Sequence, residues 1–190
     1  KIKEDLVNSG ANIKLFHCAN SAGVMSLKQA HFNLVRPGIM LYGISPSIAI
    51  TEEAGLKLKP VLSLKTRITH IRTVSAKEGV GYDLAYITPQ ETRIAVLPIG
   101  YADGYSRLYS NRARVLVRGR FAPVTGIICM DQCMIDVGHI KKVKVGDEVV
   151  LLGSQGREIV SARELAGLSQ TIPYEVLCRI SSRVPRYFVT

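Results

Sequence analysis

The hydrophobic positions of the first fifty residues follow two different periods. Residues 12–20 (NIKLFHCAN) and 32–43 (FNLVRPGIMLYG) form short apolar runs, as buried strands do. Between them, apolar residues recur at helical spacing, which predicts a helix with Ser21 as its N-cap. The polar residues 1–10 predict the end of a helix capped by Gly10. Strand, helix and strand at this spacing predict a βαβ unit and a parallel sheet.

From about Pro60 the pattern changes to many short apolar runs with turn residues between them. The runs are VLSLKTRITHIRTV, RIAVLPIG, RARVLVRG, APVTGIICM, CMIDV and GDEVVLLG. Turns at 118–119, 145–147 and 153–154 give the spacing of a small β-barrel or folded sheet.

Two short helices and a linker complete the expected organisation. A capping box at 161–164 (SARE) opens one helix, and Pro173, a favoured first-turn residue, opens the other. Residues 45–59 are the best linker between the two parts of the chain.

Composition predicts a folded chain without metal or membrane segment. Hydrophobic residues make up 47% and charged residues 21%, far from the signature of disorder. Cys18, Cys129, Cys133 and Cys178 include no CxxC pair, so we expect free buried thiols, and the scattered histidines give no metal-ligand spacing. No apolar run reaches the roughly 18–20 residues of a membrane span, and the first residues lack a signal-peptide stretch. We therefore expect a cytoplasmic location.

The net charge of +10 raises the alternative of a basic β-barrel that binds RNA. The densest basic segments are 112–120, with four arginines, and 141–144, with three lysines. No aromatic series interleaves with either segment, so we interpret both as solvated strand faces and expect no nucleic-acid partner.

Two loops of the βαβ unit could bind an anion. Ser21 follows one strand at a helix start, where free N–H groups and a partial positive charge favour anions. Arg36 and Gly38 follow the next strand, and parallel strands present both loops at the same edge. Ser21 as a simple cap and Arg36 as a cap for carbonyl groups remain the alternatives.

Glycine-framed tyrosines mark the β-rich part. They occur in GVGYD (79–83) and GYADGYSR (100–107), and an acidic loop, CMDQ, follows at 129–132. Such tyrosines suit ligand-facing turns, but on spacing alone a structural role at a hairpin corner is favoured for each.

The ordered segments FHCANSAG, VRPGIMLYG, GVGYD, LPIGYADGYSR, GIICMDQCMIDV and IPYEVLCRISSRVPR resemble the alanine racemase family nearly end to end. The resemblance implies a mainly β fold, a barrel-like C-terminal domain over 51–190. Before it, residues 1–50 would be the last βαβ elements of an incomplete (β/α)8 barrel. The chain would thus be the C-terminal fragment of the enzyme.

The resemblance implies pyridoxal 5'-phosphate as the cofactor. Ser21, the backbone at Gly38 and Ile39, and the Tyr174 hydroxyl would hold its phosphate. Arg36 would face the pyridine nitrogen, and because an arginine keeps its proton, the ring nitrogen would stay neutral.

Tyr82 is implied as the catalytic base on one face of the substrate's α-carbon, with a lysine on the other face. Because a tyrosine ordinarily ionises near pH 10, cations such as Arg36 would have to favour the phenolate. The backbone N–H of Met130 would contact the substrate carboxylate, and Tyr101 and Tyr174 would narrow the pocket. Asp131 would support the loop that carries Met130, and Arg107 would line the entry of the substrate. In the family, Tyr82 would serve the cofactor of a second subunit, so a homodimer is implied.

Two departures qualify the resemblance. Ile127 stands where the family commonly has an arginine in the access corridor, which puts anion steering in doubt. The lysine that binds the cofactor matches no position here, so we expect this chain alone to be inactive. The implied activity is interconversion of L- and D-alanine, supplying D-alanine for peptidoglycan; racemisation of serine or another small amino acid is the nearest alternative.

Overall fold

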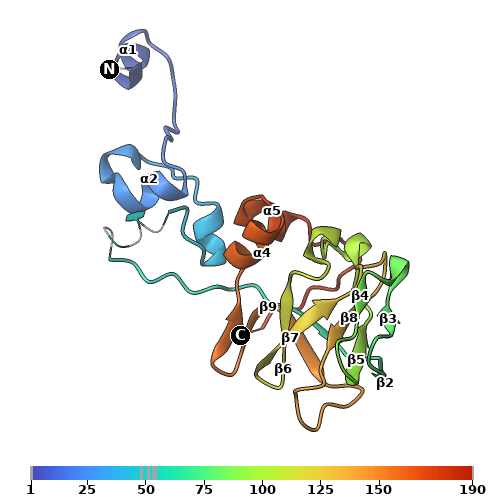
Figure 1. Ribbon diagram of the computed structural model, residues 1–190. Helices are drawn as coiled ribbons and strands as arrows, with labels where there is room; N and C mark the ends of the chain where they lie inside the picture. The colour runs from blue at the N-terminus through green and yellow to red at the C-terminus, as the bar shows by residue number, and fades with distance from the viewer. Residues whose placement is uncertain (1, 48, 51, 53–54, 190) are drawn as a thin grey trace. The chain divides into compact units, whose positions relative to one another are not determined.

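The computed structural model describes residues 2–47, 49–50, 52 and 55–189 (Figure 1). The chain divides into two compact units, Lys1–Val61 and Leu62–Thr190. The domain boundary expected after residue 50 stays a prediction. The linker expected over 45–59 includes residues 48, 51, 53 and 54, which lie outside the described residues.

Unit 1 contains short helices joined by extended segments. These are α1 (Ile2–Asn8), α2 (Ser21–Ser26) and the 3₁₀ helices η1 (Lys28–Ala30) and η2 (Ile39–Tyr42). Gly10 follows α1 with a φ of 82°, which confirms the predicted cap. In place of two paired strands, the extended segments form one isolated parallel bridge, between His17 and Leu34. The direction is the expected one, but a two-stranded parallel pair is too weak to extend by itself.

The N-cap of α2 was predicted one residue too late. Asn20 caps the helix, with its side chain accepting from the N–H of Gly23 at 3.1 Å. Asparagine ranks with serine as a cap, and here the asparagine comes first in the chain. Ser21 becomes the first helical residue, so its hydroxyl is free to bond elsewhere.

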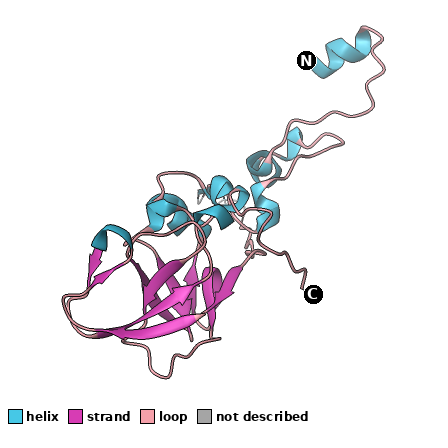
Figure 2. Ribbon diagram, turned by 90° about the vertical axis from the view of Figure 1, so that its right-hand side faces the viewer, coloured by secondary structure: helices cyan, strands magenta, loops and turns pink. Residues whose placement is uncertain are grey.

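Unit 2 is the β-rich part (Figure 2). Its strands are β1 (Leu64–Arg67), β2 (His70–Val74), β3 (Gly79–Val80), β4 (Tyr86–Ile87), β5 (Thr92–Leu97), β6 (Arg114–Val117), β7 (Arg120–Thr125), β8 (Cys133–Asp136), β9 (Glu148–Gln155) and β10 (Glu158–Val160). The main sheet is antiparallel and runs β1-β9-β6-β7-β8-β5-β2, with β10 added beside β9.

One segment joins the two ends of this sheet. β1 pairs with β9, and β2, only two residues further along, pairs with β5. Between them, Ile68 donates to the carbonyl of Asp147 and Thr69 to that of Val96, so the pairing passes from one edge to the other. The sheet therefore curls into the barrel-like fold that was expected. Its interior is aliphatic and includes Leu97, Val115, Val117, Ile135, Val149 and Leu151.

Two of the three turns predicted from the sequence are present in the structure. Arg118 and Gly119 both have positive φ in the β6–β7 hairpin, and Gly146 has a φ of 90°. The turn expected at 153–154 is wrong, because Gly153 lies within β9. A Cβ on Gly153 would lie 2.6 Å from the Ser63 hydroxyl, so this glycine permits a close approach.

Two helices and several 3₁₀ turns complete unit 2. Helix α4 (Ala162–Leu168) begins at the Ser161 cap and α5 (Pro173–Cys178) begins at its proline, as predicted. The 3₁₀ turns are η3 (Tyr82–Leu84), η4 (Tyr101–Asp103) and η5 (Arg107–Tyr109). Within the described part of the chain, no helix is both long and apolar enough to cross a membrane.

Candidate active site

An open cavity of about 670 Å³ lies in unit 2 where three loops meet. It is lined by Tyr82, Asp83, Tyr101, Arg107, Ile127, Ile128, Cys129, Met130, Asp131 and Gln132. The cavity brings together five residues that the family resemblance singled out, namely Tyr82, Tyr101, Arg107, Met130 and Asp131.

Tyr82 lies at the tip of the β3–β4 hairpin. The residue is 68% exposed, so it is open to contact with a ligand. Gly81 precedes it with a φ of 78°, and a Cβ there would lie 2.9 Å from the Met134 methyl group. After the tyrosine, Asp83 and Leu84 both have positive φ, a strained conformation for residues other than glycine.

The second tyrosine loop, 100–105, separates an exposed ring from a buried one. Tyr101 is 44% exposed at the cavity, whereas Tyr105 is 1% exposed. Burial raises the pKa of Tyr105 well above its ordinary value, and its ring packs against that of Tyr109 at 5.0 Å between centroids. The structural role favoured from sequence is thus right for Tyr105, and only the exposed tyrosines face the cavity.

Met130 is held in place through the backbone of the tyrosine loop. The N–H of Tyr101 donates to the carbonyl of Cys129, and that of Ala102 donates to the carbonyl of Met130, both at 3.0 Å. Gly100 makes this possible, since a Cβ there would lie 2.2 Å from the Cys129 carbonyl oxygen. The two loops are therefore one connected part of the wall, and β8 begins directly after them at Cys133.

Arg183 also belongs to this region, although it was not predicted from the sequence. Its guanidinium contacts Asp131 at 3.3 Å and Asp103 at 3.4 Å. It lies within the segment ISSRVPR, which carried part of the family resemblance, but the spacing along the chain gives no sign of its two partners.

The cavity is lined by one arginine, and an isoleucine lies where the family commonly has another arginine. Arg107 and Ile127 both line it. Cys129, two residues after Ile127, also lines the cavity; burial raises the pKa of its thiol, and Arg107 opposes that rise. Arg107 is therefore the cation among the lining residues, beside two acidic residues, Asp83 and Asp131.

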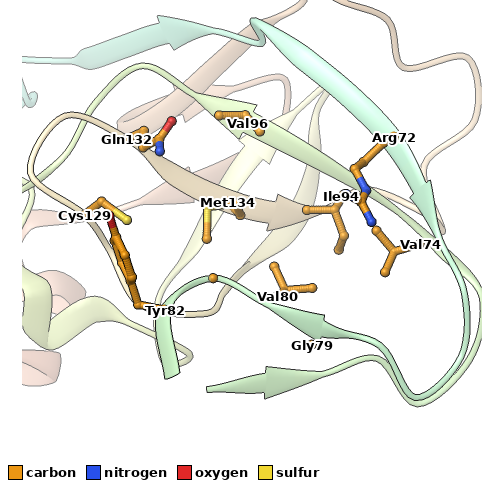
Figure 3. Close-up of a pocket in the computed structure, with 11 residues that line it drawn as sticks. Arg72, Val74, Gly79, Val80, Tyr82, Ile94, Val96, Cys129, Gln132 and Met134 are labelled. Atoms are coloured by element: carbon orange, nitrogen blue, oxygen red, sulfur yellow. The ribbon is translucent and has the colours of Figure 1, made fainter. Parts of the chain in front are cut away.

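A second, smaller cavity of about 380 Å³ lies behind Tyr82. Figure 3 shows the tyrosine ring beside Cys129 at one end and Arg72 at the other, with aliphatic side chains between. The lining includes Val74, Val80, Ile94, Val96 and Met134, and four of these form a buried cluster. The hairpin that carries Tyr82 thus packs over apolar residues of the sheet.

In unit 1, Ser21 links the starts of two helices. Its hydroxyl accepts from the N–H of Gly38 at 2.9 Å and from that of Met40 at 3.3 Å. Ser21 and Ile39 are buried. One hydroxyl and the N–H groups at the starts of α2 and η2 are therefore gathered in one place, a donor set that suits a phosphate.

Arg36 and Tyr174 occupy different settings. Arg36 is exposed, and its guanidinium donates to the carbonyl of Cys18 at 3.1 Å, so it does cap a carbonyl group as the alternative held. Tyr174 lies in the first turn of α5 and is 41% exposed. Because Tyr174 belongs to unit 2, its expected contact with the phosphate site of unit 1 stays a prediction.

The remaining charged and thiol groups were partly predicted. The arginines of 112–120 are exposed, and two of them form ion pairs, Arg114 with Glu164 and Arg118 with Asp147. All four cysteines are free, but Cys133 alone among them is buried; Cys129 is half-buried and Cys18 and Cys178 are exposed, so the expectation of buried thiols is confirmed for Cys133 and wrong for the other three. Cys178 is the last residue of α5, directly after the buried Val176 and Leu177, and Cys18 lies in an extended segment of unit 1. Across the described ranges, no three His, Cys, Asp or Glu side chains gather as a metal site would require.

These features define a β-rich domain that presents an exposed tyrosine in an open cavity, in a chain whose other unit gathers a hydroxyl and backbone N–H groups at Ser21. Sequence profiles agree with this class: residues 61–188 match the alanine racemase C-terminal domain and residues 1–46 the alanine racemase N-terminal domain. The chain belongs to the alanine racemase family.

Individual relatives support the assignment. The chain is 49% identical to an alanine racemase of Halothermothrix orenii, over 93% of this chain and 46% of the relative, and 49% identical to one of Desulforamulus reducens, over 97% and 49%. Among solved structures, alanine racemase from Bacillus anthracis with bound L-Ala-P superposes with a TM-score of 0.92 at 42% identity, covering 100% of this chain and 48% of the other. The chain spans about half the length of these relatives.

Proposed function

We propose that this chain supplies the C-terminal half of a pyridoxal-phosphate-dependent alanine racemase, with Tyr82 as one of its two bases. The observation that carries the proposal is the cavity where Tyr82, Tyr101 and Met130 meet, in a chain that belongs to the family. We also propose that the enzyme acts in the cytoplasm and that its product, D-alanine, is used for peptidoglycan.

The donor set of unit 1 fits the cofactor phosphate. Ser21, with the N–H groups of Gly38 and Ile39, would hold the phosphate, and Tyr174 would add its hydroxyl. Arg36 would face the pyridine nitrogen with a proton that it cannot release. When bound, the cofactor withdraws electrons from the substrate's α-carbon and so makes its hydrogen acidic.

Tyr82 would move that hydrogen at its hydroxyl oxygen. In one direction of the reaction, the Tyr82 phenolate accepts the α-hydrogen as a proton from one face. In the other direction, the Tyr82 phenol donates a proton to that same face. A base on the opposite face completes the inversion, and in the family that base is a lysine. Arg107 lines the same cavity.

The rest of the cavity would select a small substrate. The backbone N–H of Met130 would bind the substrate carboxylate, and Tyr101 and Tyr174 would limit the side chain to about a methyl group. Asp131 would support the loop that carries Met130. Racemisation of serine is the nearest alternative, since a hydroxymethyl group is only slightly larger.

A homodimer with shared sites is the proposed assembly. Tyr82, Tyr101 and Met130 are large side chains left between 44% and 68% exposed at one place. A second subunit that covers this cavity would bury them and would provide the cofactor that Tyr82 serves.

The test is racemisation by the complete enzyme that contains this sequence. D-amino-acid formation from L-alanine and from L-serine is measured with added cofactor. The proposal expects alanine to exceed serine in kcat/KM by at least about 10-fold, the discrimination that one small group provides. Comparable values would favour the serine alternative, and no racemisation of either would end the proposal.

This chain alone should not racemise alanine above the rate of free pyridoxal phosphate. The reason is that the cofactor-binding lysine of the family matches none of its residues. Activity of the isolated chain would show that another base replaces that lysine.

A further inference from the structure

Tyr82 lies on a hairpin whose two strands pair with each other and not with the main sheet. The β3–β4 pair forms a separate two-stranded sheet, and two residues after the tyrosine have strained backbones. Thr88, fully buried, closes the base of the hairpin by accepting from the N–H of Glu78 and donating to the carbonyl of Ser75. These Thr88 bonds do not reach the tip of the hairpin, where Tyr82 lies.

Asn111 supplies a contact at that tip. Its side-chain Nδ2 donates to the carbonyl of Ala85 at 2.9 Å, and Ala85 in turn donates to the carbonyl of Tyr82 at 3.2 Å. Its Oδ1 accepts from the N–H of Gly126 at 2.6 Å, directly before Ile127 on the cavity wall. One amide therefore ties the Tyr82 turn to the 126–132 loop.

Asn111 lies between two residues of the chain that are themselves buried. Tyr109 and Ala113, on either side of it, are 2% and 3% exposed. The neighbouring Ser110 hydroxyl accepts from the N–H of Ile128 at 3.0 Å, a second tie to the same loop. Asn111 has a φ of 55°, a conformation that asparagine tolerates better than most residues.

We infer that Asn111 is a positioning residue that sets the place of the Tyr82 hydroxyl relative to the cavity. The inference rests on the proposed function where it concerns turnover, but the position of Tyr82 can be measured without it. The amide is suited to the task because it donates to the hairpin and accepts from the loop at once, which neither a carboxylate nor a hydroxyl of that reach can do in the same geometry.

Two variants of the complete enzyme separate the two bonds. Asn111→Gly keeps the positive φ and removes both bonds. Asn111→Asp keeps an acceptor for Gly126 but places a carboxylate against the carbonyl of Ala85. Gln155→Ala is the matched control, because Gln155 also uses one amide to join two segments, accepting from Gly119 at 2.8 Å and donating to Glu148 at 3.4 Å.

The first readout is the ¹⁹F signal of 3-fluorotyrosine at position 82, assigned by its loss in Tyr82→Phe. Both Asn111 variants should shift or broaden this signal while the Tyr174 signal stays unchanged, and Gln155→Ala should alter neither. An unchanged Tyr82 signal in both Asn111 variants would overturn the inference, whether or not the protein is a racemase.

The second readout is exchange of the α-hydrogen of each alanine enantiomer with D₂O. Asn111→Gly should slow exchange of the enantiomer that depends on Tyr82 by on the order of 10- to 100-fold and leave the other nearly unchanged. Tyr82→Phe is measured beside it. Loss in Tyr82→Phe with none in Asn111→Gly would overturn the positioning role alone. No loss in Tyr82→Phe would count against the proposed function, and the ¹⁹F result then decides the inference.

Discussion

Arg183 joins Asp103 to the loop that carries Met130. Its Nε lies 3.4 Å from Oδ1 of Asp103, and its Nη2 lies 3.3 Å from Oδ1 of Asp131. The Asp103 side chain is only 12% exposed, and its second oxygen accepts from the N–H of Gly100 at 2.9 Å. The arginine therefore ties the chain near residue 183 to both loops of the cavity wall.

Arg183→Gln should lower the free energy of unfolding by about 1 kcal/mol, since the buried Asp103 carboxylate loses its charged partner. Urea unfolding measures the change. Arg120→Gln, an exposed arginine on β7, is the control and should change stability by less than about 0.5 kcal/mol. Equal effects of the two variants would show that the Arg183 contacts contribute nothing specific.

Ser21→Ala should weaken cofactor binding in the complete enzyme. The alanine leaves the N–H groups of Gly38 and Met40 without their acceptor and removes one donor to the phosphate, at a cost of about 1–3 kcal/mol. A titration followed by cofactor absorbance should show the dissociation constant rise by about 10-fold or more. Ser26→Ala, at the exposed end of α2, is the control, and a matching loss there would refute the assignment of Ser21.

Ile127→Arg should add anion steering to the cavity. A second cation near Arg107 should raise kcat/KM at low ionic strength by about 2- to 5-fold, and the gain should vanish near 1 M salt, where charges are screened within about 3 Å. Ile127→Met changes the shape without the charge. A gain that persists at high salt, or that methionine reproduces, would mean that the charge is not its cause.

Asp147 should make folding sensitive to acid. Burial raises its pKa, but the N–H of Lys144 and the guanidinium of Arg118 outweigh this and hold the pKa below the ordinary 3.8. The charged form therefore stabilises the fold fully above that value, and the stabilisation is lost as the pH falls through the lower folded pKa.

The comparison is between the native protein and Asp147→Asn, by urea unfolding from pH 6 down to pH 2.5. The variant should be less stable by about 1 kcal/mol at pH 6, and the difference should shrink in acid. Glu91→Gln controls for the loss of one exposed negative charge. A difference that stays constant over the whole range would contradict the role of Asp147.

Much of the fold could be predicted from local patterns, because caps and turns are decided by neighbouring residues. Gly10, Ser161 and Pro173 mark helix ends where they were expected. The error at Ser21 arose because Asn20 is an equally good cap, and the error at Gly153 arose because a glycine that permits a close approach looks like a turn glycine.

The contacts that shape the cavity could not be read from spacing. Asn111 bonds to Ala85 across 26 positions and Arg183 to Asp131 across 52. Such partners meet only because the curled sheet brings distant loops to one end. The family resemblance indicated five of the residues that line the cavity, whereas the residues that hold them in place were found from the structure.

The central claim is that Tyr82 moves hydrogen on one face of the substrate. Racemisation rates alone do not test it, since the equilibrium constant between enantiomers is one and kcat/KM must stay equal in both directions. The direct measurement is α-hydrogen exchange with D₂O for each alanine enantiomer in Tyr82→Phe. We predict a loss of about 100-fold or more for one enantiomer, with exchange of the other retained. Equal loss for both enantiomers, or no loss for either, would contradict the claim.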